Sequence, residues 1–189
     1  MPHDDYLSLL KSSVTQSLSI CDLVVVNLQM LSGNKVALIE FLYEFRRQFA
    51  DCAVWVKDTP QPAMARKVMT SAFEYLWFFS SGDLPTRAIG TNDFRGTISN
   101  VYAAPSQREN QFCQVHAATF PVHLPSWILS SFGVSGEIVY EPFSGTGTTL
   151  IACENLARRC RAVEISPAYV AVALERWATH TGKMPVLLA

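Results

Sequence analysis

The segment from Ile138 to Thr149, which reads IVYEPFSGTGTT, constrains the fold more than any other part of this sequence. A short apolar run ends at the acidic residue Glu141, and the chain passes two glycines before apolar residues return. Gly145 and Gly147 permit a sharp turn and let a ligand approach the main chain closely. Open α/β sheets bind ligands at such turns, at the carboxyl ends of their strands. The segment therefore predicts an α/β fold with a nucleotide-type ligand.

Three classes of ligand compete for this turn. A phosphate-binding P-loop requires a lysine after the last glycine, but Thr148 and Thr149 follow Gly147. A dinucleotide fingerprint requires a third glycine where this chain has Leu150, which disfavours an oxidoreductase. A nucleoside without phosphates remains, and S-adenosylmethionine is the common one. Glu164, at the end of the next strand, would accept the ribose hydroxyls; the alternative is that it caps the following helix.

The remaining pattern alternates strands with helices. Strands are expected at residues 23–28, 53–56, 73–79, 137–141 and 161–164, and helices at 6–19, 34–49, 125–132, 148–157 and 167–181. Asn34 is expected to cap the second helix, whose apolar stripe is Leu38, Phe41, Leu42, Phe45 and Phe49. Strands that are apolar at successive positions favour a mostly parallel sheet with helices on both faces.

Composition limits the partners and the compartment. Charged residues make up 16% of the chain, against about 25% in soluble domains, which indicates either a surface covered by a partner or a sticky monomer. The net charge of −1 means that any DNA contact must come from a local patch. Five cysteines without a CxxC pair indicate neither a disulfide framework nor a metal site. No signal peptide or membrane span is recognisable, so we expect a cytoplasmic protein that does not contact a membrane.

Two stretches carry a resemblance to a known family. EPFSGTGTT followed by RRCRAVEISPAYVAVALERW resembles the cofactor half of the β-type DNA amino-methyltransferases, which modify adenine N6 or cytosine N4. HAATFP, at residues 116–121, is similar to the other cofactor motif of that family, which precedes the turn in a permuted order. VNLQMLSGNK, VWVKDTPQPAM, FEYLWFF and FRGTISNVY are similar to segments of prophage-like members. The resemblance extends from about residue 6 to residue 183 and implies a Rossmann-like methyltransferase sheet of permuted order.

The resemblance also implies a cofactor, a substrate and site residues. The cofactor would be S-adenosylmethionine and the substrate DNA, in a bacterial or phage-encoded protein of restriction-modification type. Cofactor contacts would come from Glu141, Phe143, Ser144, Gly145, Thr146, Gly147, Thr148 and Glu164, with His116, Thr119, Phe120 and Pro121 on the methionine side. Glu141 replaces the usual aspartate, which lengthens its reach by one methylene. Residues 1–81 would be the remainder of the catalytic half and residues 116–189 the cofactor half, within one structural domain.

Between these halves, residues 82–115 lack periodicity and form the candidate target-recognition loop region. Arg87, Arg95 and Arg108 supply local positive charge there and are candidate phosphate or guanine contacts. The alternative for each is an ordinary solvated arginine.

The family's catalytic tetrapeptide is missing. Methylation of an exocyclic amine requires acceptors for its hydrogens and a ring that stacks on the flipped base, which the family supplies as Asp/Asn/Ser-Pro-Pro-aromatic. The sequence contains no Pro-Pro dipeptide. Asn27 follows a strand but lacks the prolines and the aromatic ring, so it is only a weak catalytic candidate. We expect two strands to be absent, and either a partner chain that supplies the catalytic motif, a homodimer, or a non-catalytic S-adenosylmethionine- and DNA-binding remnant.

Overall fold

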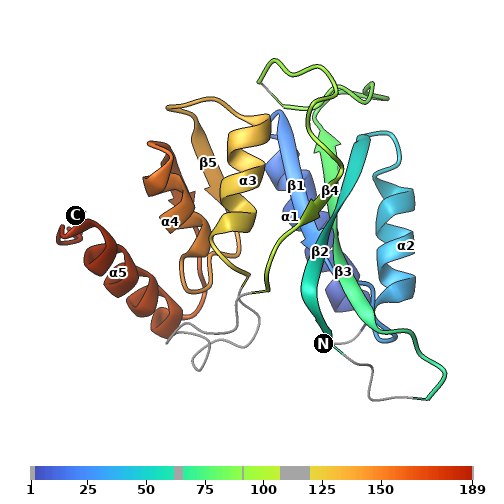
Figure 1. Ribbon diagram of the computed structural model, residues 1–189, viewed down its shortest axis with the longest axis horizontal. Helices are drawn as coiled ribbons and strands as arrows, with labels where there is room; N and C mark the ends of the chain where they lie inside the picture. Colours follow the sequence, from blue (N-terminus) through green and yellow to red (C-terminus); the bar gives the residue numbers. More distant parts are fainter. Residues whose placement is uncertain (1–2, 62–65, 91, 107–119, 189) are drawn as a thin grey trace. The chain divides into compact units, whose positions relative to one another are not determined.

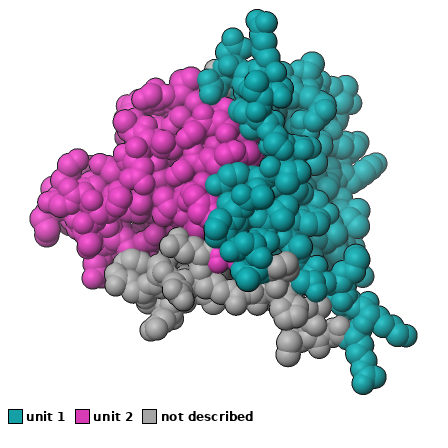
Figure 2. Space-filling view, viewed as in Figure 1, with its two compact units in different colours: residues 1–105 teal, residues 106–189 magenta. Residues whose placement is uncertain are grey.

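The computed structural model describes residues 3–61, 66–90, 92–106 and 120–188 (Figure 1). The chain forms two compact units, residues 1–105 and 106–189 (Figure 2). The first contains α1 (His3–Leu18), β1 (Leu23–Leu28), α2 (Lys35–Glu44), β2 (Phe49–Gln61), β3 (Ser71–Ser80) and β4 (Val101–Ala103). The second contains α3 (His123–Phe132), β5 (Ile138–Glu141), α4 (Thr148–Asn155), β6 (Arg159–Ala162) and α5 (Pro167–Thr181). Helices alternate with strands in the second unit, as the sequence predicts, whereas in the first unit β2, β3 and β4 follow one another without a described helix between them.

The first unit is built on a four-stranded sheet of order β1-β3-β2-β4. β3 runs antiparallel to both of its neighbours, and β4 runs parallel to β2. β2 and β3 follow one another in the chain and pair directly. The connection between them, residues 62–70, is shorter than the crossover of about a dozen residues that parallel neighbours need, so the two strands are antiparallel. The prediction of a mostly parallel sheet is therefore wrong for this unit, whose sheet is mixed.

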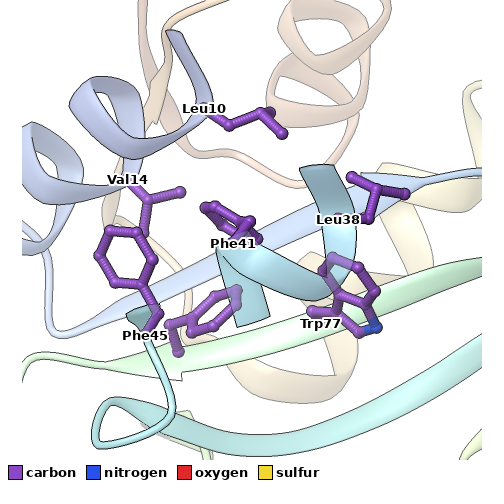
Figure 3. Close-up of a cluster of buried hydrophobic side chains, with 7 residues drawn as sticks. Leu10, Val14, Leu38, Phe41, Phe45 and Trp77 are labelled. Carbon is purple, nitrogen blue, oxygen red and sulfur yellow. The ribbon is translucent and has the colours of Figure 1, made fainter. Parts of the chain in front are cut away.

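An aromatic core joins α1 and α2 to one face of this sheet (Figure 3). The cluster comprises Leu10 and Val14 of α1, Leu38, Phe41 and Phe45 of the α2 segment, and Trp77 and Phe79 of β3. The ring of Phe41 lies 5.6 Å from that of Phe79, measured between centroids, and 6.0 Å from that of Trp77. Leu76 and Phe78, on the opposite face of β3, are also fully buried. The predicted stripe is confirmed as far as Phe45.

Three details of the prediction need correction. Phe49 is not helical: α2 ends at Glu44, and Phe49 begins β2 and pairs with Phe79. Asn34 occupies the N-cap position of α2, but its side chain bonds backward, accepting from Leu31 N at 2.7 Å and donating to Gln29 O at 3.0 Å. β4 lies inside the region that was predicted to be irregular. The sequence did not predict this strand, because three residues are too few to show a periodic pattern.

The second unit is a parallel β5–α4–β6 crossover followed by α5. β5 pairs with β6 from Ile138 opposite Arg159 to Glu141 opposite Ala162, so both strands end at the same edge. β6 therefore begins and ends two residues earlier than the expected strand at 161–164. α5 begins with Pro167 and ends at Thr181, and it is followed by Gly182, whose φ of 70° is left-handed. Both boundaries of α5 confirm the sequence prediction.

No helix of the described residues is long and apolar enough to cross a membrane. Those residues also contain no group of three or more histidine, cysteine, aspartate or glutamate side chains that could hold a metal ion.

Candidate cofactor site

The turn between β5 and α4 requires its glycines. Gly145 has a φ of 52° and Gly147 a φ of 79°, both in the left-handed region that glycine tolerates best. Gly147 is the N-cap residue of α4 and donates to Ser144 O at 2.9 Å. A Cβ atom added at Gly147 would lie 2.9 Å from the Cβ of Ala173, because α5 packs directly on the turn. Backbone conformation and close packing therefore both demand glycine at 147.

Glu164 connects this turn to the start of α5. Its Oε2 accepts a hydrogen bond from Gly145 N at 2.7 Å, and its Oε1 accepts one from Ser166 N at 2.8 Å. Ser166, the N-cap residue of α5, makes no side-chain cap of its own. An ionised carboxylate has about four lone-pair sites, so its two oxygens can accept several hydrogen bonds at once. Glu164 thus bonds both the turn and the segment before α5.

Glu141 is held inside the same turn. Its Oε1 accepts from Phe143 N at 3.0 Å, and its Oε2 accepts from the Thr149 hydroxyl at 2.8 Å. The extra methylene relative to aspartate lets one carboxylate span from the end of β5 to the first turn of α4. Glu141 therefore links the first residues of the turn to the first turn of α4.

Arg176 of α5 donates hydrogen bonds to the turn, a role that the sequence analysis did not predict. Its Nη1 donates to Thr146 O at 2.6 Å, to the Thr146 hydroxyl at 3.1 Å and to the Thr148 hydroxyl at 3.4 Å. Arg176, Thr146 and Thr148 are all buried. The sequence could have indicated this burial. Arg176 follows Ala173 by three residues and therefore lies on the helix face that the apolar stripe predicts to be buried.

The other predicted cofactor residues differ in exposure. Phe143 is 55% exposed, Ser144 and Phe120 are half-buried, and Pro121 is buried just before α3. His116 and Thr119 lie outside the described residues, so their part in the site stays a prediction.

Two thiols lie behind the turn, where α4 packs against β6. A hydrogen bond between them and burial raise the pKa of the Cys153 thiol, and the same hydrogen bond lowers the pKa of Cys160. Both cysteines are free. Cys153 is therefore a neutral donor at neutral pH, and the pair contributes to packing behind the site.

The predicted catalytic and DNA-binding residues lie in or beyond the first unit. Asn27, in β1, donates from its amide nitrogen to Tyr75 O of β3 at 3.2 Å. Arg87 forms an ion pair with Asp51 near the start of β2, at 2.7 Å. Arg95 is exposed, and Arg108 lies outside the described residues. Their proposed roles in catalysis and DNA contact stay predictions.

Comparison with known proteins identifies the family. A sequence model of the N6 and N4 DNA methylases matches residues 4–175. The chain belongs to the N6/N4 DNA methylase family. The cofactor of this family is S-adenosylmethionine, as the sequence resemblance implied.

Relatives of this methylase chain include two curated bacterial enzymes. The type II methyltransferase M.SmaI of Serratia marcescens is 28% identical over 134 residues, which cover 65% of this chain and 44% of that protein. The type II methyltransferase M.Cfr9I of Citrobacter freundii is 25% identical over 126 residues, 65% of this chain and 42% of that protein. The methylase chain thus spans less than half the length of these relatives.

Solved structures share the fold of the methylase chain. The cytosine-N4-specific PvuII DNA methyltransferase aligns with a TM-score of 0.76 at 19% identity, over 93% of this chain and 71% of that one. The M1.HpyAVI–SAM complex aligns with a TM-score of 0.68 at 21% identity, over 93% and 85% of the two chains. These matches confirm the predicted methyltransferase-like α/β fold.

Replacing Gly147 by alanine should destabilise the methylase chain more than the same change at Gly136. Both residues have a left-handed φ, 79° and 83°, so both variants lose about 1 kcal/mol to backbone strain. Only at Gly147 would the new Cβ meet Ala173, whereas Gly136 has nothing within 4 Å. The extra loss should be about 1–3 kcal/mol. Urea unfolding followed by circular dichroism measures it, and equal losses would contradict the packing described for α5.

Proposed function

We propose that this chain binds S-adenosylmethionine in its second unit and is the cofactor-binding part of a DNA methyltransferase acting on adenine N6 or cytosine N4. The observation that carries the proposal is the carboxylate of Glu164, held 2.7 Å from Gly145 N beside the glycine turn. That arrangement suits a nucleoside: a carboxylate for the ribose hydroxyls, a main chain open to close approach, and no lysine for phosphates.

Each residue of the turn has a proposed part in binding. Phe143, 55% exposed, offers an apolar ring to the cofactor, and Ser144 through Thr148 form the floor beneath it. Glu141 keeps the turn closed through its bonds to Phe143 N and Thr149. His116, Thr119, Phe120 and Pro121 are proposed to line the methionine side. Bound S-adenosylmethionine would supply the methyl group for transfer to an exocyclic amine.

Glu164→Gln should weaken S-adenosylmethionine binding at least about tenfold, because a carboxamide has one acceptor oxygen where the carboxylate has two. Calorimetric titration of the purified chain measures the affinity, and a thermal melt reports whether the variant is folded. Glu175→Gln, which removes an exposed carboxylate from α5, is the matched control and should bind as the unaltered chain does. A folded Glu164→Gln chain with unchanged affinity would contradict the proposed site.

DNA is the proposed substrate, and residues 82–115 are proposed to contact it. Arg95 is the sharpest test, since it is exposed while the guanidinium of Arg87 is paired with Asp51. Arg95→Ala should weaken binding to a short DNA duplex and reduce the salt slope by about one. Arg87→Ala should have a smaller effect, because its ion pair must first break. Fluorescence anisotropy at several salt concentrations decides, and an unchanged slope for Arg95→Ala would remove it from the interface.

We further propose that the catalytic tetrapeptide comes from a partner polypeptide. β1 is apolar at five of its six positions, as central strands are, yet it lies at the edge of its sheet. β5, which carries the cofactor turn, pairs only with β6 among the described strands. Open strand edges accept another strand. The absence of a Pro-Pro dipeptide from these residues also favours a second candidate, a non-catalytic S-adenosylmethionine- and DNA-binding remnant.

Adding a polypeptide that ends in a strand and Asp/Asn/Ser-Pro-Pro-aromatic should produce methyl transfer, and the chain alone should produce none. The measurement is transfer of labelled methyl from S-adenosylmethionine to DNA, with the mass of the complex from light scattering. The same polypeptide with the aromatic residue changed to alanine is the control. Transfer by the chain alone would contradict the partner proposal, a doubled mass without added polypeptide would indicate a homodimer, and no transfer in any mixture would favour the remnant.

The family membership also suggests the source of the protein and the process in which it acts. Type II methyltransferases of bacteria are among the relatives, so a bacterial or phage-encoded protein that acts beside a restriction enzyme is proposed. A cytoplasmic location, where DNA is accessible, is part of this proposal.

A further inference from the structure

We propose that Arg176 is a positioning residue for the cofactor: it sets the conformation of the glycine turn through which Glu164 acts. The inference rests on the proposed binding of S-adenosylmethionine. Arg176 lies near the middle of α5 and is 9% exposed. Its Nη1 donates to the carbonyl and hydroxyl oxygens of Thr146 and to the hydroxyl of Thr148, at 2.6, 3.1 and 3.4 Å.

These acceptors flank Gly147, one of the two glycines of the turn, which has no side chain to hold it. Gly147 lies between Thr146 and Thr148 with a φ of 79°, a conformation that glycine can leave easily. Thr146 is 2% exposed, so its carbonyl would lose a partner in a dry environment if the guanidinium were removed. Hydrogen bonds from a charged donor are also stronger than neutral ones. Arg176 therefore determines which conformation of the turn is stable.

Adjacent residues of the turn are bonded to opposite charges. The N–H of Gly145 donates to the carboxylate of Glu164, which precedes α5, and the C=O of Thr146 accepts from Arg176 within α5. Ala173, one helical turn before Arg176, contacts Gly147 and fixes the distance of α5 from the turn. The Thr146 carbonyl and the Gly147 N–H form one peptide group, so if that carbonyl turned away, Gly147 would lose its hydrogen bond to Ser144 O. The Ser144 carbonyl in turn shares its peptide group with the Gly145 N–H, so the bond that orients the carboxylate of Glu164 would be lost as well. Arg176 thus acts on the cofactor through Glu164.

Arg158 provides a matched control in the same unit. Its side chain is 5% exposed, and it donates to Glu137 Oε2 and to Leu129 O, both at 2.8 Å. Glu137 precedes β5, so this arginine lies at the end of the strand opposite the turn. Arg176→Met and Arg158→Met each remove a buried guanidinium of the same size. If both arginines served only to stabilise the fold, the two variants should lose cofactor affinity equally.

The experiment is calorimetric titration with S-adenosylmethionine, below the melting temperature of each variant, together with thermal melts. Both methionine variants should melt earlier, but only Arg176→Met should lose affinity, by roughly tenfold or more. Arg176→Lys, which keeps a cation able to reach Thr146 O, should recover part of the loss. Thr148→Val, which removes one acceptor and keeps the guanidinium, should lose affinity by a smaller factor and serves if Arg176→Met does not fold.

Unchanged affinity in the folded Arg176→Met chain, or in Arg176→Lys and Thr148→Val together, would overturn the positioning role. An equal loss of affinity in Arg158→Met would overturn it as well, since the effect would then be one of general stability. Failure of the unaltered chain to bind S-adenosylmethionine would overturn the proposed function itself, and with it this inference.

Discussion

The carboxylate of Glu164 is the contact on which the candidate site depends. A turn made of two left-handed glycines has little conformational preference of its own, and its peptide groups must be fixed by something outside it. Glu164 does so by accepting the N–H of Gly145 and the N–H of Ser166 at once. The turn between β5 and α4 and the beginning of α5 are therefore tied to one side chain.

Two arginines with buried side chains stabilise the elements around this turn. Buried charges are stable only when they are hydrogen-bonded, and the side chains of Arg158 and Arg176 both use main-chain carbonyls as acceptors. Arg176 bonds the turn from α5, and Arg158 bonds the end of α3 to the residue before β5. The two arginines thus hold opposite ends of the same strand.

The first unit is organised differently. Its stability comes from aromatic and aliphatic side chains that α1, α2 and β3 bury together, with Phe41 in contact with both Trp77 and Phe79. Its exposed polar bonds include the Arg87–Asp51 pair. An apolar strand, β1, lies at the edge of the sheet. The first unit is therefore a scaffold held by apolar packing, whereas the turn of the second unit is held by polar bonds.

The sequence alone determined most of the elements, the turn and the family, because these depend on local patterns: the apolar run LVVVNL, the glycines at 145 and 147, Pro167 and Gly182 at the two ends of α5, and the acid at the end of β5. Only the tertiary structure decided what depends on long-range pairing. β3 is antiparallel, the Asn34 side chain bonds the loop before α2, and Arg176 reaches the turn from 30 residues away in sequence. Periodicity reports which face of an element is buried, but it carries no information about the partner that buries it.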